Sequence, residues 1–137
     1  ELNDDFSLIY IDIENIESFQ ETYGSNFIVD IRNKLMQTIS TLVSHSDIVS
    51  TITPDVLCIA LPQKDNVSIR HLIDKISKYF DQNGLQVNGQ TININICISV
   101  TTLQQDDTGI RALHVRADKG LMKAKAMGGQ QIVFVDM

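Results

Sequence analysis

The sequence predicts an α/β fold of the α+β type, in which a mostly antiparallel central sheet is flanked by helices. Short apolar runs of strand length alternate with longer segments whose apolar residues recur at helical spacing. A tight hairpin interrupts this alternation, so neighbouring strands are not restricted to a parallel arrangement. The chain has 137 residues, of which 43% are hydrophobic, which is enough for one domain with its own core. The expected order of elements is β-αα-β-β-α-β-α-β.

The first strand and the two helices after it are predicted from residues 6–42. Residues 6–13 are almost entirely apolar, which is typical of a central strand. A short helix should follow and end at Gly24. Ser25 or Asn26 is expected to cap the next helix. The inward face of that helix should consist of apolar residues at helical spacing, namely Ile28, Ile31, Leu35, Ile39 and Leu42.

A β-hairpin is predicted for residues 46–62, because two apolar runs flank a turn that contains Pro54 and Asp55. In a split βαβ arrangement the first strand lies beside the third. Asp12, at the end of the first strand, should then lie close to Asp55, at the start of the third. The predicted layout therefore brings together two acids that are distant in the sequence.

The next segment is predicted to form a helix, a small hairpin and a strand. The inward face of this helix should contain the apolar residues Ile69, Leu72, Ile73, Ile76 and Phe80. Asn88-Gly89 is a strong signal for the turn of a hairpin. Residues 91–100 alternate between Ile or Val and smaller or polar residues. This alternation predicts a strand with one wet or loosely covered face.

The last part of the chain should supply one more long helix and a final strand. Asp106 or Asp107 is expected to start the helix, and Gly128-Gly129 should end it. The residues expected on its inward face are Ile110, Leu113, Ala117, Leu121 and Ala124. Residues 132–135 are predicted as the final strand, and no linker, repeat or low-complexity segment divides the chain.

Composition narrows the classes of function. The net charge is −6 and the 11 basic residues are scattered, which disfavours nucleic acid as a partner. The apolar runs are too short to span a bilayer, so no direct membrane contact is expected. Cys58 and Cys97 lie in predicted strands and lack the spacing of a metal or redox pair, so we expect buried thiols in a cytoplasmic domain. Because the chain begins at Glu1, we expect a piece of a longer protein, and a membrane-anchored parent stays an open alternative.

Asp12 and Asp55 are candidates for a metal site on residue type alone. Carboxylates and nearby backbone carbonyls are the ligands that Mg²⁺ prefers when it also holds nucleotide phosphates. Such an ion can neutralise phosphate charge and activate an attacking hydroxyl. In the alternative interpretation, Asp12 ends a strand and Asp55 favours a turn.

Three segments together resemble the GGDEF domain of diguanylate cyclases, which condense two GTP molecules into cyclic di-GMP. Residues 8–24, LIYIDIENIESFQETYG, resemble the family's apolar strand and its DxDxFKxxND segment. Residues 46–62 resemble its SD…GGDEF…LP hairpin, and residues 117–128, ADKGLMKAKAMG, resemble its ADxALYxAKxxG helix. The resemblance covers nearly the whole chain and implies a single domain over residues 1–137 with a nucleotide-cyclase or palm-like fold.

The signature itself is degenerate in this chain. Aligned on Pro62, the GGDEF positions fall on Thr53-Pro54-Asp55-Val56-Leu57. Both glycines, which allow the backbone to approach the nucleotide, are replaced. Asp55 keeps a position that is a metal ligand in the family, whereas Val56 replaces the next acid. An apolar side chain can neither coordinate a metal nor accept a proton, so no catalytic residue is expected here.

The resemblance assigns a residual metal site and two nucleotide contacts outside the signature. Asp12 and the Ile13 carbonyl keep metal-ligand positions of the family, so Mg²⁺ is the candidate cofactor. Gln20 holds the position of a guanine-reading Asn, but Val29 replaces the Asp that acts with it. A site built to hydrogen-bond a base loses much of its specificity when one polar partner becomes apolar.

Lys125 matches a lysine that contacts phosphate in the family. The arginine expected four residues further on is replaced by Gly129. A phosphate contact and an ordinary exposed lysine remain equally open interpretations of Lys125.

Many family members bind their product at an inhibitory RxxD site before the signature. In this chain the tetrad is Ser44-His45-Ser46-Asp47, so Asp47 remains and the arginine is missing. Serine cannot replace the bidentate guanidinium. Product sensing by this route is therefore expected to be lost.

Three functions are consistent with this combination, in decreasing order of support. The first is a catalytically inactive regulatory, dimerisation or docking domain in cyclic di-GMP signalling. Its partners would be other domains of the same polypeptide, a signalling protein or a second copy. The second is a magnesium-dependent domain that binds or weakly hydrolyses GTP or ATP at the residual metal site. An active diguanylate cyclase has the least support.

Overall fold

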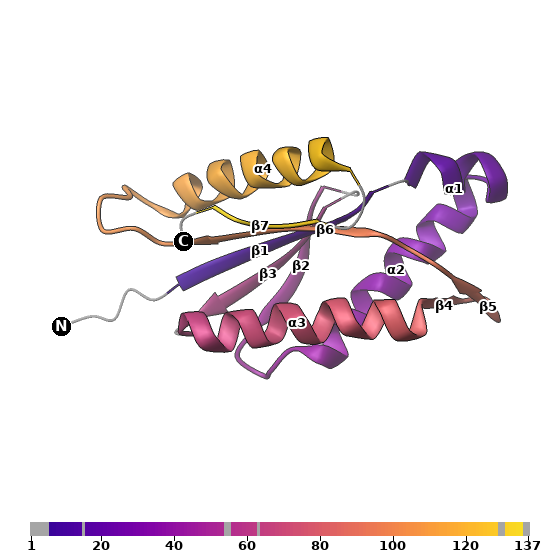
Figure 1. Cartoon of the computed structure of the whole chain (residues 1–137), viewed down its shortest axis with the longest axis horizontal. Coiled ribbons are helices and arrows are strands. Elements are labelled where there is room, and N and C mark those ends of the chain that lie inside the picture. Colours follow the sequence, from indigo (N-terminus) through magenta and orange to yellow (C-terminus); the bar gives the residue numbers. More distant parts are fainter. Residues whose placement is uncertain (1–5, 15, 54–55, 63, 129–130, 136–137) are drawn as a thin grey trace.

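The computed structural model describes residues 6–14, 16–53, 56–62, 64–128 and 131–135. The elements follow one another in the order β1 (Phe6–Ile13), α1 (Ile16–Tyr23), α2 (Ser25–Leu42), β2 (Ile48–Thr53), β3 (Val56–Pro62), α3 (Asn66–Asn83), β4 (Leu85–Val87), β5 (Gln90–Ile92), β6 (Ile96–Thr102), α4 (Ile110–Met127) and β7 (Gln131–Phe134) (Figure 1). This is the predicted order, with β4 and β5 as the small hairpin.

Among the described residues, five strands form the central sheet in the order β2-β3-β1-β6-β7. β1 pairs antiparallel with β3 and with β6, and β2 pairs antiparallel with β3, whereas β6 and β7 are parallel. Tyr10 of β1 lies opposite Cys58 of β3 and Ser99 of β6. The predictions of a mostly antiparallel sheet and of the first strand beside the third are therefore confirmed.

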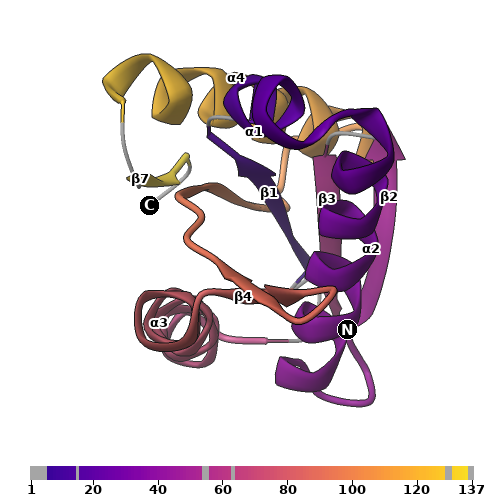
Figure 2. The same cartoon turned by 90° about the vertical axis from the view of Figure 1, so that its right-hand side faces the viewer.

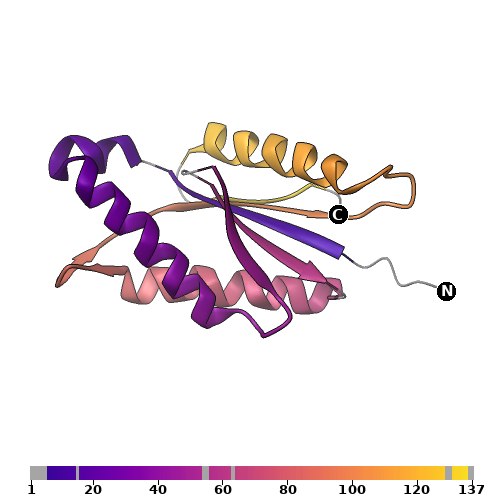
Figure 3. The ribbon, with the colours of Figure 1, turned by 180° about the vertical axis from the view of Figure 1, so that it is seen from behind.

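Helices cover both faces of the sheet. Figures 2 and 3 show α4 on one side of the sheet and α2 with α3 on the other. Ile9 and Ile11 of β1 pack in the larger core cluster with α2 and α3, whereas Leu8 and Tyr10 pack in a smaller cluster with α4. α1 extends beyond the end of the sheet (Figure 1). Alternate residues of β1 thus face two separate cores, which is why its sequence is a continuous apolar run.

The predicted inward faces of the long helices are largely correct. The residues that are buried as expected are Ile28, Ile31, Leu35, Ile39, Ile69, Leu72, Ile73, Ile76, Phe80, Leu113, Ala117, Leu121 and Ala124. Leu42 is half-buried, and the prediction for Ile110 is wrong, since this residue is 52% exposed. Within the described residues, no helix is both long and apolar enough to cross a bilayer.

The start of α4 also differs from the prediction, because Asp107 has another role. The Asp107 carboxylate accepts hydrogen bonds from Arg116 Nη1 at 2.7 Å and Nη2 at 2.8 Å, and from the Gln104 backbone N–H at 2.7 Å. The hydrogen bonds from Arg116 lower the pKa of Asp107 to about 2. Since this carboxylate is committed to the loop, α4 begins later, at Ile110, with Gly109 at the N-cap.

The predicted cap of α2 is likewise wrong. Gly24 occupies the N-cap position with a φ of 89°, and Ser25 is already the first residue of the helix. The left-handed conformation, which glycine adopts readily, lets the chain turn from α1 directly into α2. Because Gly24 alone connects the two helices, Ser25 and Asn26 fall inside α2.

The strand predicted over residues 91–100 is broken and better covered than expected. β5 ends at Ile92 and β6 begins at Ile96. Cys97 and Ser99, on the face predicted to be wet, are buried because α4 packs over them. Gly120 of α4 allows this close approach, since a Cβ at this position would collide with the Ser99 hydroxyl.

Candidate functional site

Asp12 is a buried carboxylate at the end of β1, with 4% of its surface exposed. Its Oδ1 accepts a hydrogen bond from the Ile13 backbone N–H at 2.7 Å. Its Oδ2 forms an ion pair with the ammonium of Lys125, in the last turn of α4. Each carboxylate oxygen therefore already has a partner within the chain.

The ion pair joins two positions that the sequence suggests for separate roles, one as a metal ligand and one as a phosphate contact. α4 runs along β1, so its last turn lies over the end of that strand (Figure 1). The Lys125 side chain is 43% exposed, and its ammonium lies between the buried acid and solvent. Lys125 is thus a partner of Asp12 rather than an isolated surface lysine.

A small cavity lies next to Asp12. It is lined by residues from five elements or their ends, namely Asp12, Ile13, Ile16, Arg32, Leu35, Thr51, Val56 and Leu57. Its volume of about 20 Å³ is enough for one water molecule or ion. Small-molecule sites are usually of the order of 300 Å³ or more, so the cavity lined by these described residues is too small to enclose a nucleotide. Pro54 and Asp55 lie outside the described residues, and the predicted role of Asp55 stays a prediction.

Val56 occupies the place beside Asp12 where the family signature has an acid. Ile11 pairs with Leu57, so the next pair in this register brings Val56 alongside Asp12. Val56 is half-buried and packs against the smaller core cluster under α4. The side chain beside the buried carboxylate therefore contributes methyl groups and no charge.

Arg32 is a part of the site that the sequence analysis missed. It lies on α2, is half-buried, and lines the cavity with Asp12. Arg32 follows Ile28 by four residues and precedes Leu35 by three, so it shares the inward stripe of the helix. A cation within an otherwise apolar stripe is the signal that could have identified it.

The described residues do not fit a magnesium site. Mg²⁺ requires a near-octahedral set of oxygen ligands and retains several waters. Asp12 is the one described carboxylate that lines the cavity, and both of its oxygens are engaged. The Lys125 ammonium also places a positive charge beside this carboxylate. Over the described ranges, no group of three or more His, Cys, Asp or Glu residues is arranged to hold a metal.

Gln20 lies apart from this cavity. It is exposed on α1, and its Nε2 donates a hydrogen bond to the Ser25 hydroxyl at 3.3 Å. Val29, at the position paired with it in the family, is 53% exposed. The structure therefore places the two predicted base-reading positions on an outer surface of α1 and α2, and the role of Gln20 stays a prediction.

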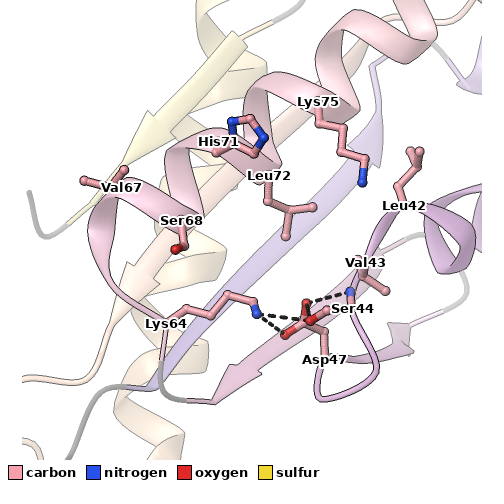
Figure 4. A pocket seen from close by; sticks show the side chains of 10 residues that line it. All are labelled: Leu42, Val43, Ser44, Asp47, Lys64, Val67, Ser68, His71, Leu72 and Lys75. Carbon is pink, nitrogen blue, oxygen red and sulfur yellow. Dashed lines mark hydrogen bonds and ion pairs between the residues drawn. The ribbon is translucent and has the colours of Figure 1, made fainter.

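Asp47 directly precedes β2, at the end of that strand away from the Asp12 cavity. Its carboxylate contacts the Ser44 backbone N–H, the Ser44 hydroxyl and the Lys64 ammonium. Its side chain is 1% exposed. Oδ2 accepts hydrogen bonds from the Ser44 backbone N–H at 3.1 Å and from the Ser44 hydroxyl at 2.9 Å. The Lys64 ammonium lies 3.3 Å from Oδ1 and also donates to the Ser44 hydroxyl at 3.1 Å. Figure 4 shows this cluster at the edge of a groove between α3 and the end of α2.

Cys58 and Cys97 are both buried, as predicted. Burial raises the pKa of the Cys58 thiol to about 11 and also raises the pKa of Cys97. β1 lies between the two strands that carry them, so the thiols are too far apart to form a disulfide. Both behave as core residues rather than as nucleophiles.

Comparisons with known proteins agree with the arrangement of these elements. The family model described as "Diguanylate cyclase, GGDEF domain" matches residues 1–131. Diguanylate cyclase A of Treponema denticola is 20% identical over 132 residues, which are 96% of this chain and 36% of that protein. The chain thus spans about a third of the length of this curated relative.

Solved structures share the fold. The GGDEF domain of YfiN (TpbB) from Pseudomonas aeruginosa superimposes with a TM-score of 0.88 at 15% identity, covering 98% of this chain and 84% of that one. The active GGEEF domain of a diguanylate cyclase from Vibrio cholerae gives 0.85 at 22% identity, covering 98% and 85%. Such identities establish a common fold and leave the chemistry to the site. With the family match over nearly its whole length, the chain belongs to the GGDEF domain family.

Proposed function

We propose that this chain is a non-catalytic GGDEF domain that regulates, or docks with, other domains of its polypeptide or a partner protein in cyclic di-GMP signalling. The observation that carries this proposal is the state of Asp12. Its carboxylate is paired with Lys125 and hydrogen-bonded to Ile13, and the neighbouring side chain is Val56. The family's chemistry requires acids at these positions that face metal and substrate.

Recruiting Asp12 to a metal would be costly. The ion pair with Lys125 compensates for burying the carboxylate, and an approaching divalent cation would have to displace this ammonium. The apolar Val56 offers no second carboxylate to attract the cation. These features favour a structural role for Asp12.

A docking role is consistent with what is known of one relative. A diguanylate cyclase from Pseudomonas aeruginosa, SiaD, has been solved in complex with its activator SiaC. That chain shares the fold with a TM-score of 0.85 at 16% identity. We infer that this chain likewise works through contacts with another protein or domain, which include pairing with a second copy.

A second candidate function is magnesium-dependent binding of GTP or ATP. It is favoured by the retention of Asp12 and Ile13 at one cavity and of Lys125 as the ion-pair partner of Asp12. In this case Lys125 would leave Asp12 for a phosphate, and Mg²⁺ would be held by Asp12, the Ile13 carbonyl and Asp55. Asp55→Asn should then abolish binding of the nucleotide with Mg²⁺, whereas persistent binding would exclude this site.

The test of the main proposal is turnover of GTP. The domain is incubated with GTP and Mg²⁺, with an active GGDEF domain as the positive control, and cyclic di-GMP is quantified by chromatography. We expect no product above the level of a protein-free sample, because Val56 cannot act as a ligand or base. Formation of cyclic di-GMP that increases with protein concentration would contradict the proposal.

A further inference from the structure

A groove near Asp47 is large enough for a small molecule. It lies between the end of α2, the turn before β2, and α3 (Figure 4). Its volume is about 380 Å³, within the range of small-molecule sites. The groove is therefore much larger than the cavity at Asp12 and lies at the opposite end of β2.

The acid in this groove is not available to a ligand. Ser44 donates two hydrogen bonds to Asp47, and Lys64 pairs with the same carboxylate. A purine or other base that donates N–H groups would have to displace these partners. The tetrad also lacks the arginine that would hold a base edge or phosphate with a bidentate fork. The groove thus differs in chemistry from a site for the cyclic dinucleotide product.

The remaining lining combines apolar walls with a cation. Leu42, Val43, Val67 and Leu72 form the apolar part of the groove. Val67 is 77% exposed, so its side chain is accessible to a ligand in the groove. Figure 4 shows the Lys75 side chain extending from α3 toward Leu42, with its ammonium over the groove.

The charges around the groove favour an anion. Asp47 and Lys64 offset each other, and His71, one helical turn before Lys75, supplies a ring that can donate a hydrogen bond. Lys75 is then the charge that faces a ligand. A lysine next to an apolar surface suits a molecule with an acidic head and an apolar body, since each part meets a matching surface.

We propose that this groove binds a small organic anion whose acidic head contacts Lys75 and whose apolar body lies against Val67 and Leu72. The site is independent of the chemistry at Asp12, so it holds whether or not that cavity takes a nucleotide. In a regulatory domain, such a ligand would be an input signal. The carboxylate and apolar body, rather than a nucleobase, define the ligand class.

The test uses a fluorescent dye displaced by simple probes. Anilinonaphthalene sulfonate, an aromatic anion, is bound to the domain and displaced by octanoate, by octyl glucoside as a neutral amphiphile, or by cyclic di-GMP. We expect octanoate to displace the dye at lower concentration than either of the others. Far-UV circular dichroism and thermal unfolding establish that each variant used is folded.

Substitutions in the groove test whether octanoate and the dye bind there. Lys75→Gln should raise the octanoate concentration for half-displacement roughly two- to fivefold, as expected for one exposed ion pair. Lys78→Gln is the matched control, because Lys78 lies on the same helix, pairs with Asp74 at 3.1 Å and does not line the groove. Val67→Asp, at an exposed position, should weaken octanoate binding at least as much as Lys75→Gln does.

Three outcomes would overturn the proposal. Equal effects of Lys75→Gln and Lys78→Gln would place the dye elsewhere on the surface. Displacement by octyl glucoside as effective as by octanoate would remove the requirement for an anion. Displacement by cyclic di-GMP at lower concentration than octanoate, lost in Lys75→Gln, would show a dinucleotide site instead.

Discussion

Asp12 and Asp47 are both buried aspartates that pair with a lysine, yet they border cavities of very different size. Asp12 borders a cavity of about 20 Å³, whereas Asp47 stands in the wall of a groove of about 380 Å³. Each accepts a hydrogen bond from a nearby backbone N–H, that of Ile13 or that of Ser44. Retention of an acid therefore does not by itself preserve a site, because the neighbouring groups decide what the acid can bind.

The two pairs also differ in what lies next to them. At Asp12 the lysine pairs with the acid that keeps a metal-ligand position of the family. At Asp47 the lysine occupies the acid but leaves the adjacent groove open, with Lys75 facing it (Figure 4). Substitutions that break each pair should therefore have different consequences.

The largest effect is expected at Asp12. Asp12→Ala leaves the buried Ile13 N–H without its acceptor and removes the ion pair with Lys125, and should lower the free energy of unfolding by about 2–3 kcal/mol. Asp12→Asn should cost less, since it keeps an acceptor. Urea denaturation measures both, with the exposed Asp81→Ala as a control expected within about 0.5 kcal/mol. An Asp12→Ala variant as stable as the control would contradict this account.

Asp47→Ala should cost less, about 1–2 kcal/mol, because the contacts that it loses are confined to one turn and to Lys64. Ser44 itself is exposed, so water can replace part of the lost bonding. The same urea experiment compares the two aspartates directly. If Asp47→Ala were the more destabilising substitution, the turn rather than the Asp12 pair would be the more important contact.

Val56→Glu tests whether the missing acid is what separates this cavity from a metal site. The substitution places a second carboxylate beside Asp12. We expect Mg²⁺, at about ten times its dissociation constant, to stabilise this variant by about 1.4 kcal/mol in thermal unfolding. The parent protein, measured alongside, should show no such shift. Equal stabilisation of both proteins would mean that Val56 does not limit metal binding.

The smallest difference at neutral pH is expected for a third acid, Asp107, which lies in the loop before α4 and pairs with Arg116 of that helix. Because its folded pKa is about 2, below the ordinary value of 3.8, its pairing contributes stability above pH 4. That contribution should disappear as the pH falls from about 4 to 2. Asp107→Asn should thus be less stable than the parent at pH 7 and approach it near pH 2. A stability difference between Asp107→Asn and the parent that does not change with pH would exclude the pairing of Asp107 as its cause.

The sequence predicts the fold well because the determining signals are local. The apolar run of residues 6–13 and the hairpin of residues 46–62 are enough to place β1 beside β3. The Asn88-Gly89 turn is also as predicted, with φ values of 51° and 80°. These features depend on hydrophobic periodicity and on the residues at turns, both of which can be recognised in a short stretch of sequence.

Several errors come from tertiary contacts that a local pattern does not contain. The start of α4 depends on the pairing of Asp107 with Arg116. The burial of Ser99 depends on Gly120, which is 21 residues away in sequence (120 − 99) but adjacent in space. The pairing of Asp12 with Lys125 requires α4 to end over β1. Arg32 could have been noticed from its position on the inward stripe of α2, but its approach to Asp12 could not.

The most direct test of the central claim is calorimetric titration of the domain with GTP, with and without Mg²⁺. If Asp12 is held by Lys125 in place of a metal, GTP should give no heat of binding that depends on Mg²⁺. Asp12→Asn, which removes the charge but keeps the shape, should behave in the same way. Magnesium-dependent binding of GTP that is lost in Asp12→Asn would contradict the account and establish a nucleotide site at this cavity.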